Sequence, residues 1–460
     1  MRLLLAIWVG KITGYLCRIL GTGGTTLPGL VSQTIDPSFV EKITKDLKKG
    51  SVVISGTNGK TTTANMLASI LKEANISYVH NKAGANLMRG VASALIWQID
   101  IFGKIDKDLG IFEIDEATIP YAIAEIKPKI VLITNFFRDQ LDRYGELNTI
   151  SNLAKKSLKD LSKSALVILN AHDPFVANLG GDLKNKTIYF GLEDKNYTLG
   201  KIPHSADVTR CRQCDKPYTY KTVYFSHIGK FSCPFCQIHS PAPQIKAENL
   251  KIKSPSASSQ EITTPSGKFK INLNLGGIYN TYNALAATAI SYLLGIKNSI
   301  IKKGLENFKP AFGRIEEIKV GPKKIFLFLV KNPTGMNEVL RTISSQKNLN
   351  LIFALNDNFA DGRDVSWIWD ADLEILKDKT INQITASGIR AEDMALRLKY
   401  AGLNQKIKIE KDYKKALLEG LGNLKILETL YILPTYTAML DLRKTLQKMG
   451  LVKGFWLDTK

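Results

Sequence analysis

Residues 51–63 read SVVISGTNGKTTT, and this stretch decides the fold. A short β-branched run passes directly into a glycine-rich loop and then into a helix-length segment, Thr62 to Ala74. Glycines let successive backbone N–H groups converge on phosphate oxygens at a helix N-terminus, and a lysine adds a mobile positive charge. The stretch therefore predicts a phosphate-binding loop, in which the Thr61 hydroxyl can ligate Mg²⁺. Its expected ligands are Gly56, Thr57, Asn58, Gly59, Lys60, Thr61 and Thr62.

Strands and helices are expected to alternate on both sides of this loop. Apolar β-branched runs at 130–134 and 165–169 alternate with helix-length segments, which is the pattern of a parallel sheet with crossover helices. A polar, Ser/Pro-rich segment, 248–265, predicts an exposed loop or an edge hairpin, and an Ala-rich helix is expected over 283–294. A second group of strands is expected at 324–330, 349–355, 383–387 and 430–433.

The domain organisation follows from this pattern and from the length. A chain of 460 residues can form two or three packed cores. We expect an α/β protein with an N-terminal helix and lead-in over 1–50, a central domain with a parallel sheet and the phosphate-binding loop over 51–318, and a C-terminal α/β domain over 319–460. Residues 204–240, rich in Cys, Tyr, Pro and His, are expected to form an insert in the central domain.

The charge balance favours anionic partners. Lys plus Arg number 63 against 42 Asp plus Glu, so the net charge is +21. Such an excess attracts nucleotides, pyrophosphate groups, nucleic acid or anionic lipid, although a lysine-rich solvated surface is an equal alternative. The 44% hydrophobic and 23% charged fractions are those of a soluble globular protein.

The first twenty residues are apolar but contain Lys11 and Arg18, so their longest uncharged run is too short to span a membrane. They predict an amphipathic helix that packs on its own domain or, alternatively, touches a membrane surface. Without an export signal the expected compartment is the reducing cytoplasm.

Four of the five cysteines form two closely spaced pairs, which predict a zinc ribbon. The pairs are Cys211-x-x-Cys214 and Cys233-x-x-Cys236, and four thiolates leave Zn²⁺ no open position, so the expected zinc is structural. His227 and His239 are expected on the surface. Cys17, in the apolar first helix, is expected to be a packed thiol.

Several short segments, taken in order, resemble the Mur ligases. The loop GTNGKTT is similar to the form found in Mur ligases and folylpolyglutamate synthetases, which make acyl phosphates from carboxylates, and Ile54 stands where the full Walker pattern has glycine. The further matches are FEIDE at 112–116, RDQLDRY at 138–144, NAHDP at 170–174, YNTYN at 279–283 and GRIE at 313–316. The resemblance implies that Glu113, or else Glu116, holds Mg²⁺. It also implies that Asn280 faces the nucleotide and Arg314 its phosphates, while Gln140 replaces a metal-binding histidine.

The C-terminal half resembles the MurT branch of that family, the synthetase subunits of lipid II isoglutaminyl synthase. A strand is followed by four carboxylates, Asp357, Asp361, Asp364 and Asp370, which mark a site or cap an acidic turn. These carboxylates, the segments at 331–337 and 433–439, and the inserted ribbon carry the resemblance. It implies ATP-dependent amidation of the α-carboxylate of D-glutamate in the lipid II stem peptide, through an acyl phosphate, at the inner membrane face. It also implies ATP, Mg²⁺ and structural Zn²⁺, and a GatD-like glutaminase partner whose triad Asp364 completes.

Two alternative functions remain open from the sequence. One is a Mur ligase that adds an amino acid to a UDP-linked muropeptide. The other is a nucleic-acid-binding ATPase with a zinc ribbon. Neither a helicase-like nor a base-stacking motif is present, so no nucleic acid is expected as a partner.

Overall fold

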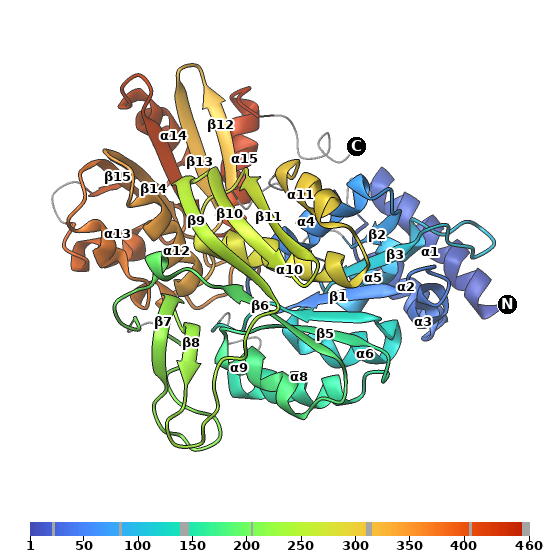
Figure 1. Ribbon diagram of the computed structural model, residues 1–460. Helices are drawn as coiled ribbons and strands as arrows, with labels where there is room; N and C mark the ends of the chain where they lie inside the picture. The colour runs from blue at the N-terminus through green and yellow to red at the C-terminus, as the bar shows by residue number, and fades with distance from the viewer. Residues whose placement is uncertain are drawn as a thin grey trace.

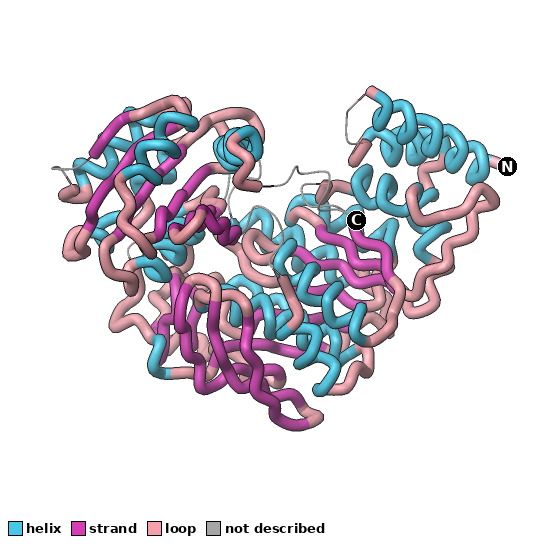
Figure 2. The backbone as a smooth tube through the Cα atoms, turned by 90° about the horizontal axis from the view of Figure 1, so that it is seen from above, coloured by secondary structure: helices cyan, strands magenta, loops and turns pink. Residues whose placement is uncertain are grey.

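The computed structural model describes residues 1–20, 24–81, 85–138, 147–203, 206–309, 315–403 and 407–452. These residues form a nine-stranded sheet, a six-stranded sheet and a two-stranded hairpin (Figure 1). Seen from above, the six-stranded sheet and its helices form a separate lobe, the C-terminal lobe, beside the lobe that contains the nine-stranded sheet (Figure 2).

The nine-stranded sheet has the order β11-β10-β9-β6-β5-β4-β1-β3-β2. Every neighbouring pair from β2 to β9 is parallel, and β9, β10 and β11 are antiparallel. The expected strands at 51–55, 130–134 and 165–169 are confirmed to within one residue. The nine strands are β1 (Ser51–Ser55), β2 (Tyr78–His80), β3 (Leu109–Glu113), β4 (Ile130–Ile133), β5 (Leu166–Asn170), β6 (Thr187–Leu192), β9 (Ile245–Ser254), β10 (Ala257–Thr264) and β11 (Gly267–Leu273).

Helices cover both faces of this sheet, which explains why its central strands are apolar throughout. Val52 and Ile54 face one buried core and Val53 faces the other, because successive side chains alternate across a strand. One layer contains α4 (Lys60–Glu73), α10 (Ile278–Leu293) and α11 (Asn298–Glu306). The other contains α5 (Met88–Ile96), α6 (Ile119–Ile126), α8 (Leu147–Lys159) and α9 (Pro174–Ala177). Because the paired strands from β2 to β9 run parallel, their carboxyl ends lie on the same side of the sheet, and the glycine-rich loop lies there.

Three helices precede the sheet: α1 (Arg2–Ile19), α2 (Leu27–Ile35) and α3 (Phe39–Thr44). The packing of α1 on its own domain is confirmed. A Cβ atom at Gly10 would lie 2.2 Å from Ser32 Oγ, and one at Gly14 2.6 Å from the Trp97 ring, so small residues are needed there. The expected amphipathic character is wrong, because the outward face of α1 is also apolar. Leu5 and Ile12, for example, are 51% and 59% exposed.

The polar segment at 248–265 forms most of the β9–β10 hairpin, so a hairpin is confirmed and the loop alternative is wrong. The edge strand of the sheet is β11, which pairs with β10 beyond this hairpin. Burial alternates along β10, with Ile262 in the core, because one face of this antiparallel region packs inward. The insert forms a separate hairpin of β7 (Thr219–Phe225) and β8 (Ile228–Ser232).

The six-stranded sheet has the order β12-β13-β17-β14-β15-β16. Its first strand begins at Ile315 and pairs with β13, so this sheet starts ahead of the expected boundary at 318. The strands are β12 (Ile315–Val320), β13 (Lys323–Phe328), β14 (Leu349–Ala354), β15 (Ile381–Ser387), β16 (Ile407–Ile409) and β17 (Thr429–Pro434). The helices are α12 (Pro333–Ile343), α13 (Ala391–Tyr400), α14 (Tyr413–Gly422) and α15 (Tyr436–Lys448). Short 3-10 helices occur at η1 (Glu116–Thr118), η2 (Asn178–Asp182), η3 (Lys195–Tyr197), η4 (Ser366–Trp369) and η5 (Leu373–Leu376).

Candidate active site

The glycine-rich loop joins the end of β1 to the first turn of α4. Gly56 and Gly59 have φ angles of +121° and +90°, which side chains rarely adopt. A Cβ atom would also lie 2.3 Å from Thr134 Oγ1 at the first position and 2.2 Å from Asn283 Oδ1 at the second. Both positions therefore require glycine, and the loop can wrap tightly around the N-terminus of α4, as a phosphate-binding turn does.

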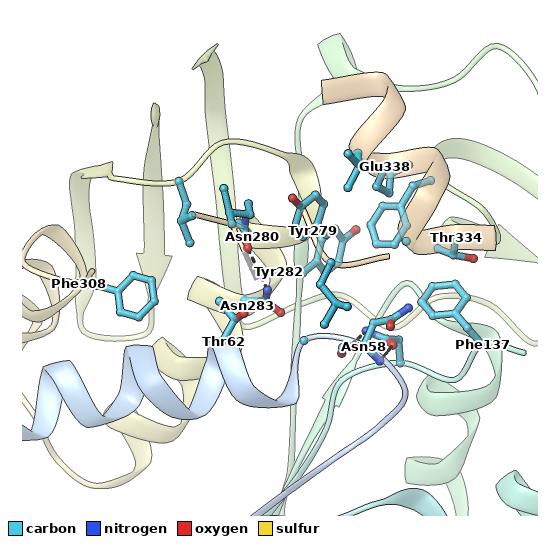
Figure 3. A pocket seen from close by; sticks show the side chains of 18 residues that line it. Asn58, Thr62, Phe137, Tyr279, Asn280, Tyr282, Asn283, Phe308, Thr334 and Glu338 are labelled. Atoms are coloured by element: carbon cyan, nitrogen blue, oxygen red, sulfur yellow. Dashed lines mark hydrogen bonds between the residues drawn. The ribbon is translucent and has the colours of Figure 1, made fainter. Parts of the chain in front are cut away.

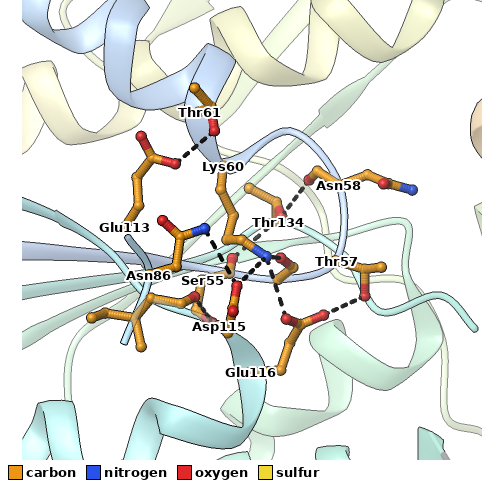
Figure 4. Close-up of polar contacts among 12 residues, drawn as sticks. Ser55, Thr57, Asn58, Lys60, Thr61, Asn86, Glu113, Asp115, Glu116 and Thr134 are labelled. Atoms are coloured by element: carbon orange, nitrogen blue, oxygen red, sulfur yellow. Dashed lines mark hydrogen bonds and ion pairs between the residues drawn. The ribbon is translucent and has the colours of Figure 1, made fainter. Parts of the chain in front are cut away.

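Lys60 is the first residue of α4, and its side chain folds back over the loop, where the residue is 7% exposed. Its Nζ donates to Gly56 O at 2.6 Å and lies 3.3 Å from Glu116 Oε2 and 3.4 Å from Asp115 Oδ1 (Figure 4). Burial by itself raises the pKa of Glu116, but Lys60 and the Thr57 hydroxyl outweigh it, so the pKa of this carboxyl is lowered. Glu116 is thus an ionised partner that holds the lysine in the loop.

Glu113 makes a different contact, with the threonine that follows the lysine. The Thr61 hydroxyl donates to Glu113 Oε2 at 2.7 Å (Figure 4). On the other side of the carboxylate, His80 Nε2 lies 2.9 Å from Glu113 Oε1. Ile54 of β1 pairs with Glu113 at the end of β3, which brings the carboxylate to the start of α4. A hydroxyl and a carboxylate are oxygen ligands of the kind Mg²⁺ prefers. Of the two candidate carboxylates, the structure brings Glu113 to Thr61 and Glu116 to Lys60.

A pocket opens beside the loop, between α10 and the C-terminal lobe (Figure 3). Asn58, Gly59 and Thr62 form one wall. Asn280 lines the pocket from α10, where its Nδ2 donates to Gly276 O at 2.6 Å and its Oδ1 accepts from Asn283 Nδ2 at 3.2 Å. The predicted Asn280 therefore does lie beside the loop.

Other residues of this pocket could not be identified from the sequence. Glu338 of α12 is buried, and burial raises the pKa of its carboxyl despite the neighbouring Arg341. Asn332, the N-cap of α12, donates from Nδ2 to Asn58 Oδ1 at 3.3 Å and so joins the C-terminal lobe to the loop. The missed lining residues include Phe137, Tyr279, Phe308, Thr334 and Glu338. Of these residues, Tyr279 lies in a segment that the sequence marks, because it precedes Asn280 in YNTYN.

The NAHDP segment connects the strand ends behind the loop. Asn170 Nδ2 donates to Thr134 O at 2.9 Å, and the Asp173 carboxylate accepts from Phe136 N at 2.8 Å. His172 is buried, and its Nδ1 lies 2.8 Å from the Tyr282 hydroxyl. Burial, with the charge of Lys230 nearby, lowers the pKa of His172 to about 3, so this imidazole is neutral. These contacts fix the segment after β4, from which Asn135 lines the pocket beside the loop.

The four clustered cysteines converge. Their sulfur atoms lie within 4.8 Å of one another, which is compatible with a zinc site. The two Cys-x-x-Cys turns are alike, because Asp215 N donates to Cys211 O and Gln237 N donates to Cys233 O. Cys17 is buried in α1, as expected.

One expectation for the insert is wrong, because His227 is fully buried while His239 is exposed. The β7–β8 turn inserts His227 against the central domain, with Nε2 3.5 Å from Asp173 Oδ2 and the ring 4.8 Å from that of Phe137. The neighbouring Phe225 lines the pocket, so the ribbon forms part of the wall of the candidate active site.

A second polar cluster lies at the carboxyl ends of β14 and β17, which are adjacent parallel strands. Asp361 is buried and accepts from the backbone N–H of Thr437 at 2.8 Å, and burial raises the pKa of its carboxyl. Asp357 lies 3.1 Å from Arg390 Nη1, and Asp370 lies 3.6 Å from Arg138 Nη2. The segments around 356–370 and 433–439 therefore come together, as carboxylates at strand ends suggested.

Asp364 is exposed to solvent, as is Asp370, whereas Asp361 is buried and Asp357 is half-buried. Asp364 Oδ1 accepts from the Ser366 backbone N–H at 2.8 Å, and this contact lowers the pKa of the carboxyl. An aspartate that orients a histidine in a catalytic triad is usually buried, and within this chain Asp364 is not. Arg314 and Gln140 lie outside the described residues. In the part of the chain that the structure describes, we find no helix both long and apolar enough to cross a membrane.

Two protein-family models match this chain: the Mur ligase middle domain over residues 54–233, and MurT ligase C-terminal over residues 329–439. The chain is 34% identical over 418 residues to "Lipid II isoglutaminyl synthase (glutamine-hydrolyzing) subunit MurT" of Staphylococcus aureus strain COL, covering 90% of this chain and 92% of the relative. It is 32% identical over 455 residues to the protein of the same name from Streptococcus pneumoniae strain ATCC BAA-255 / R6, covering 98% of each.

Solved structures share the fold. A pseudomurein peptide ligase type C from Methanothermus fervidus matches with a TM-score of 0.66 at 24% identity, over 88% of this chain and 79% of that one. The MurF ligase from Thermotoga maritima in complex with ADP matches with a TM-score of 0.64 at 12% identity, over 91% and 85%. The predicted α/β fold class, with a parallel sheet and an inserted cysteine cluster, is confirmed.

Proposed function

The chain belongs to the MurT family, a branch of the Mur ligases, and on that premise we propose that it is the synthetase subunit of a lipid II isoglutaminyl synthase. In the proposed reaction, ATP phosphorylates the α-carboxylate of D-glutamate in the lipid II stem peptide. Ammonia then displaces phosphate to give D-isoglutamine. The observation that carries the proposal is the similarity to MurT subunits along nearly the whole chain, both lobes included.

The residues around the loop fit ATP and Mg²⁺. Backbone N–H groups at the start of α4, together with the Lys60 ammonium, would bind the phosphates, and Thr61 with Glu113 would hold Mg²⁺. When bound, Mg²⁺ supplies positive charge to the phosphoryl oxygens. Lys60 would exchange its present acceptor, Gly56 O, for a phosphate oxygen, with Glu116 keeping it charged and in place. Its contribution is electrostatic stabilisation of the transferring group.

The pocket beside the loop would take the nucleoside. Asn280 is held by Gly276 O and Asn283 and lines this pocket together with the Tyr279 and Phe308 rings, which suit a flat base. Arg314 is proposed to face the phosphates, from the family resemblance alone. Because Asn332 of the C-terminal lobe is hydrogen bonded to Asn58 of the loop, a movement of this lobe would also shift the loop.

Ammonia would come from a GatD-like glutaminase partner. Four of the five cysteines share one cluster and Cys17 is buried in α1, so no cysteine of this chain is placed to act as a glutaminase nucleophile. Asp364 is exposed on the C-terminal lobe and would orient a histidine of the partner subunit once the two surfaces meet. The substrate would be reached from the cytoplasm, at the inner face of the cell membrane.

The nitrogen source separates this function from that of an amino-acid-adding Mur ligase. We expect phosphate release from ATP to require lipid II and ammonium, and not to be supported by any single amino acid with a UDP-linked muropeptide. Phosphate release measured across these combinations tests the proposal. Turnover with an amino acid and the UDP-linked muropeptide, in the absence of ammonium, would instead establish the alternative.

The cysteine cluster is proposed to hold one structural Zn²⁺. We expect Cys233→Ser to lose the metal and to lower the melting temperature, because metal binding in such sites contributes to folding free energy. Cys17→Ala, which changes the cysteine outside the cluster, should keep the metal and serves as the matched control. Metal content by mass spectrometry, together with thermal unfolding, measures both. Stoichiometric zinc retained in Cys233→Ser would exclude this site.

A further inference from the structure

The outward face of α1 is an unusual surface for a helix at the edge of a protein. Its residues repeat with helical spacing and are large and apolar: Leu5, Trp8, Ile12, Tyr15, Leu16 and Ile19, exposed by 51%, 49%, 59%, 58%, 54% and 81%. The inward face is apolar too and packs on the domain through Ala6, Ile7 and the two glycines. We call these six outward residues the α1 face. Solvent does not stabilise such a surface, and a contiguous exposed apolar patch marks an interaction site.

A neighbouring loop extends the α1 face. The Trp8 indole N–H donates to Ile101 O at 2.8 Å, which ties the loop to the helix. The Asp100 carboxylate accepts from the backbone N–H groups of Phe102 and Lys104, so the loop is held in a turn of fixed shape. Phe102, at 78% exposure, thus projects beside the helix. The loop is an ordered part of the same apolar surface.

The charges around the α1 face favour an anionic occupant. Residues 1–35 contain Arg2, Lys11 and Arg18 and no Asp or Glu. Arg2 and Arg18 are exposed near the two ends of α1, while Lys11 Nζ is used within the domain, where it donates to Ile96 O and Ile99 O. Exposed Trp and Tyr among aliphatic residues, flanked by arginines, are typical of a helix that lies in the headgroup region of a membrane.

We infer that the α1 face and Phe102 dock this protein onto an anionic lipid membrane, with α1 lying in the plane of the headgroups. The choice of a membrane as the occupant rests on the proposed function, in which the substrate is lipid-linked. Ala6 and Ile7 share a buried core with Val53 of β1 and Phe112 of β3, so α1 is firmly attached to the domain that carries the glycine-rich loop. Docking would hold the active site close to the membrane surface.

Vesicle binding by the full-length chain tests this inference. The probes are vesicles of phosphatidylcholine with and without phosphatidylglycerol, and the test variant is Ile12→Gln/Leu16→Gln. We expect the wild type to sediment with the anionic vesicles more strongly than with the neutral ones. The variant should bind at least about tenfold more weakly, because two exposed aliphatic side chains no longer gain free energy on burial in the acyl boundary. Leu418→Gln/Ile426→Gln, at exposed positions of the C-terminal lobe, is the matched control and should bind as the wild type does.

Several outcomes would overturn the inference. They are absence of wild-type binding, equal binding to neutral and anionic vesicles, and unchanged binding of the α1 variant. Loss of self-association in the variant without vesicle binding by the wild type would assign the face to a protein contact. The vesicle assay contains neither ATP nor lipid II, so its failure leaves the proposed reaction standing. Conversely, phosphate release on detergent-dispersed lipid II needs no vesicle, and the α1 variant should retain it.

Discussion

Replacement of Lys60 by methionine is expected to lower ATP-dependent turnover by about 10³-fold, because a preorganised positive charge on the transferring phosphoryl group is lost in a buried site. The substitution has a second effect that must be measured separately. Without Lys60, the pKa of Glu116 would rise from its lowered wild-type value, because burial would be opposed by less positive charge, and Glu116 would lose its ion pair with the loop. Phosphate release and thermal unfolding should therefore be recorded together, with turnover assayed well below the melting temperature of the variant.

A matched lysine lies on the same helix. Lys72 is exposed in the last turn of α4, so Lys72→Met should change neither turnover nor unfolding appreciably. If Lys60→Met, still folded by thermal unfolding, releases phosphate at a rate within tenfold of the wild type, Lys60 does not act on the transferred phosphate. The assignment of the loop would then have to be abandoned.

Replacement of Asp364 by asparagine is expected to abolish glutamine-dependent amidation while ammonium-dependent amidation continues. An asparagine cannot stabilise the imidazolium of a partner histidine, and such a change in a triad costs about 10⁴-fold. Because Asp364 is exposed and an asparagine oxygen can still accept from the Ser366 N–H, the unfolding free energy should change by less than about 0.5 kcal/mol. The two rates are compared in the presence of a glutaminase partner.

Asp378→Asn provides the control, since Asp378 is an exposed aspartate of the same lobe. It should support both nitrogen sources. Equal losses with glutamine and ammonium in Asp364→Asn would place this residue in the synthetase reaction, and no loss with either would remove it from the mechanism.

The sequence predicted the loop well because its chemistry is local. A strand, two glycines with positive φ and a lysine at the helix start are contiguous, so Gly56, Gly59 and Lys60 lie where the pattern requires them. The strand-end position of Glu113 followed in the same way, from parallel pairing of β3 with β1. Spacing likewise identified the four cysteines, because each pair forms its own turn.

What the sequence could not provide depends on contacts between distant segments. Glu338 lines the pocket from α12 of the C-terminal lobe, and no local sequence pattern marks this residue. His227 looked like a surface residue of a polar insert, yet the ribbon turn buries it against Phe137. The outward face of α1 was misjudged because apolar residues occur on all sides of that helix, and only the packed structure shows which of them stay exposed.

The most direct test of the proposed reaction follows nitrogen into lipid II. The chain is incubated with ATP, Mg²⁺, lipid II and isotopically heavy ammonium, without a partner subunit, and the lipid product is analysed by mass spectrometry alongside ADP. We expect one heavy nitrogen on the D-glutamate of each product molecule and one ADP for each nitrogen incorporated. ADP formation without heavy nitrogen in lipid II, or ADP formation that does not depend on lipid II, would contradict the proposed amidation.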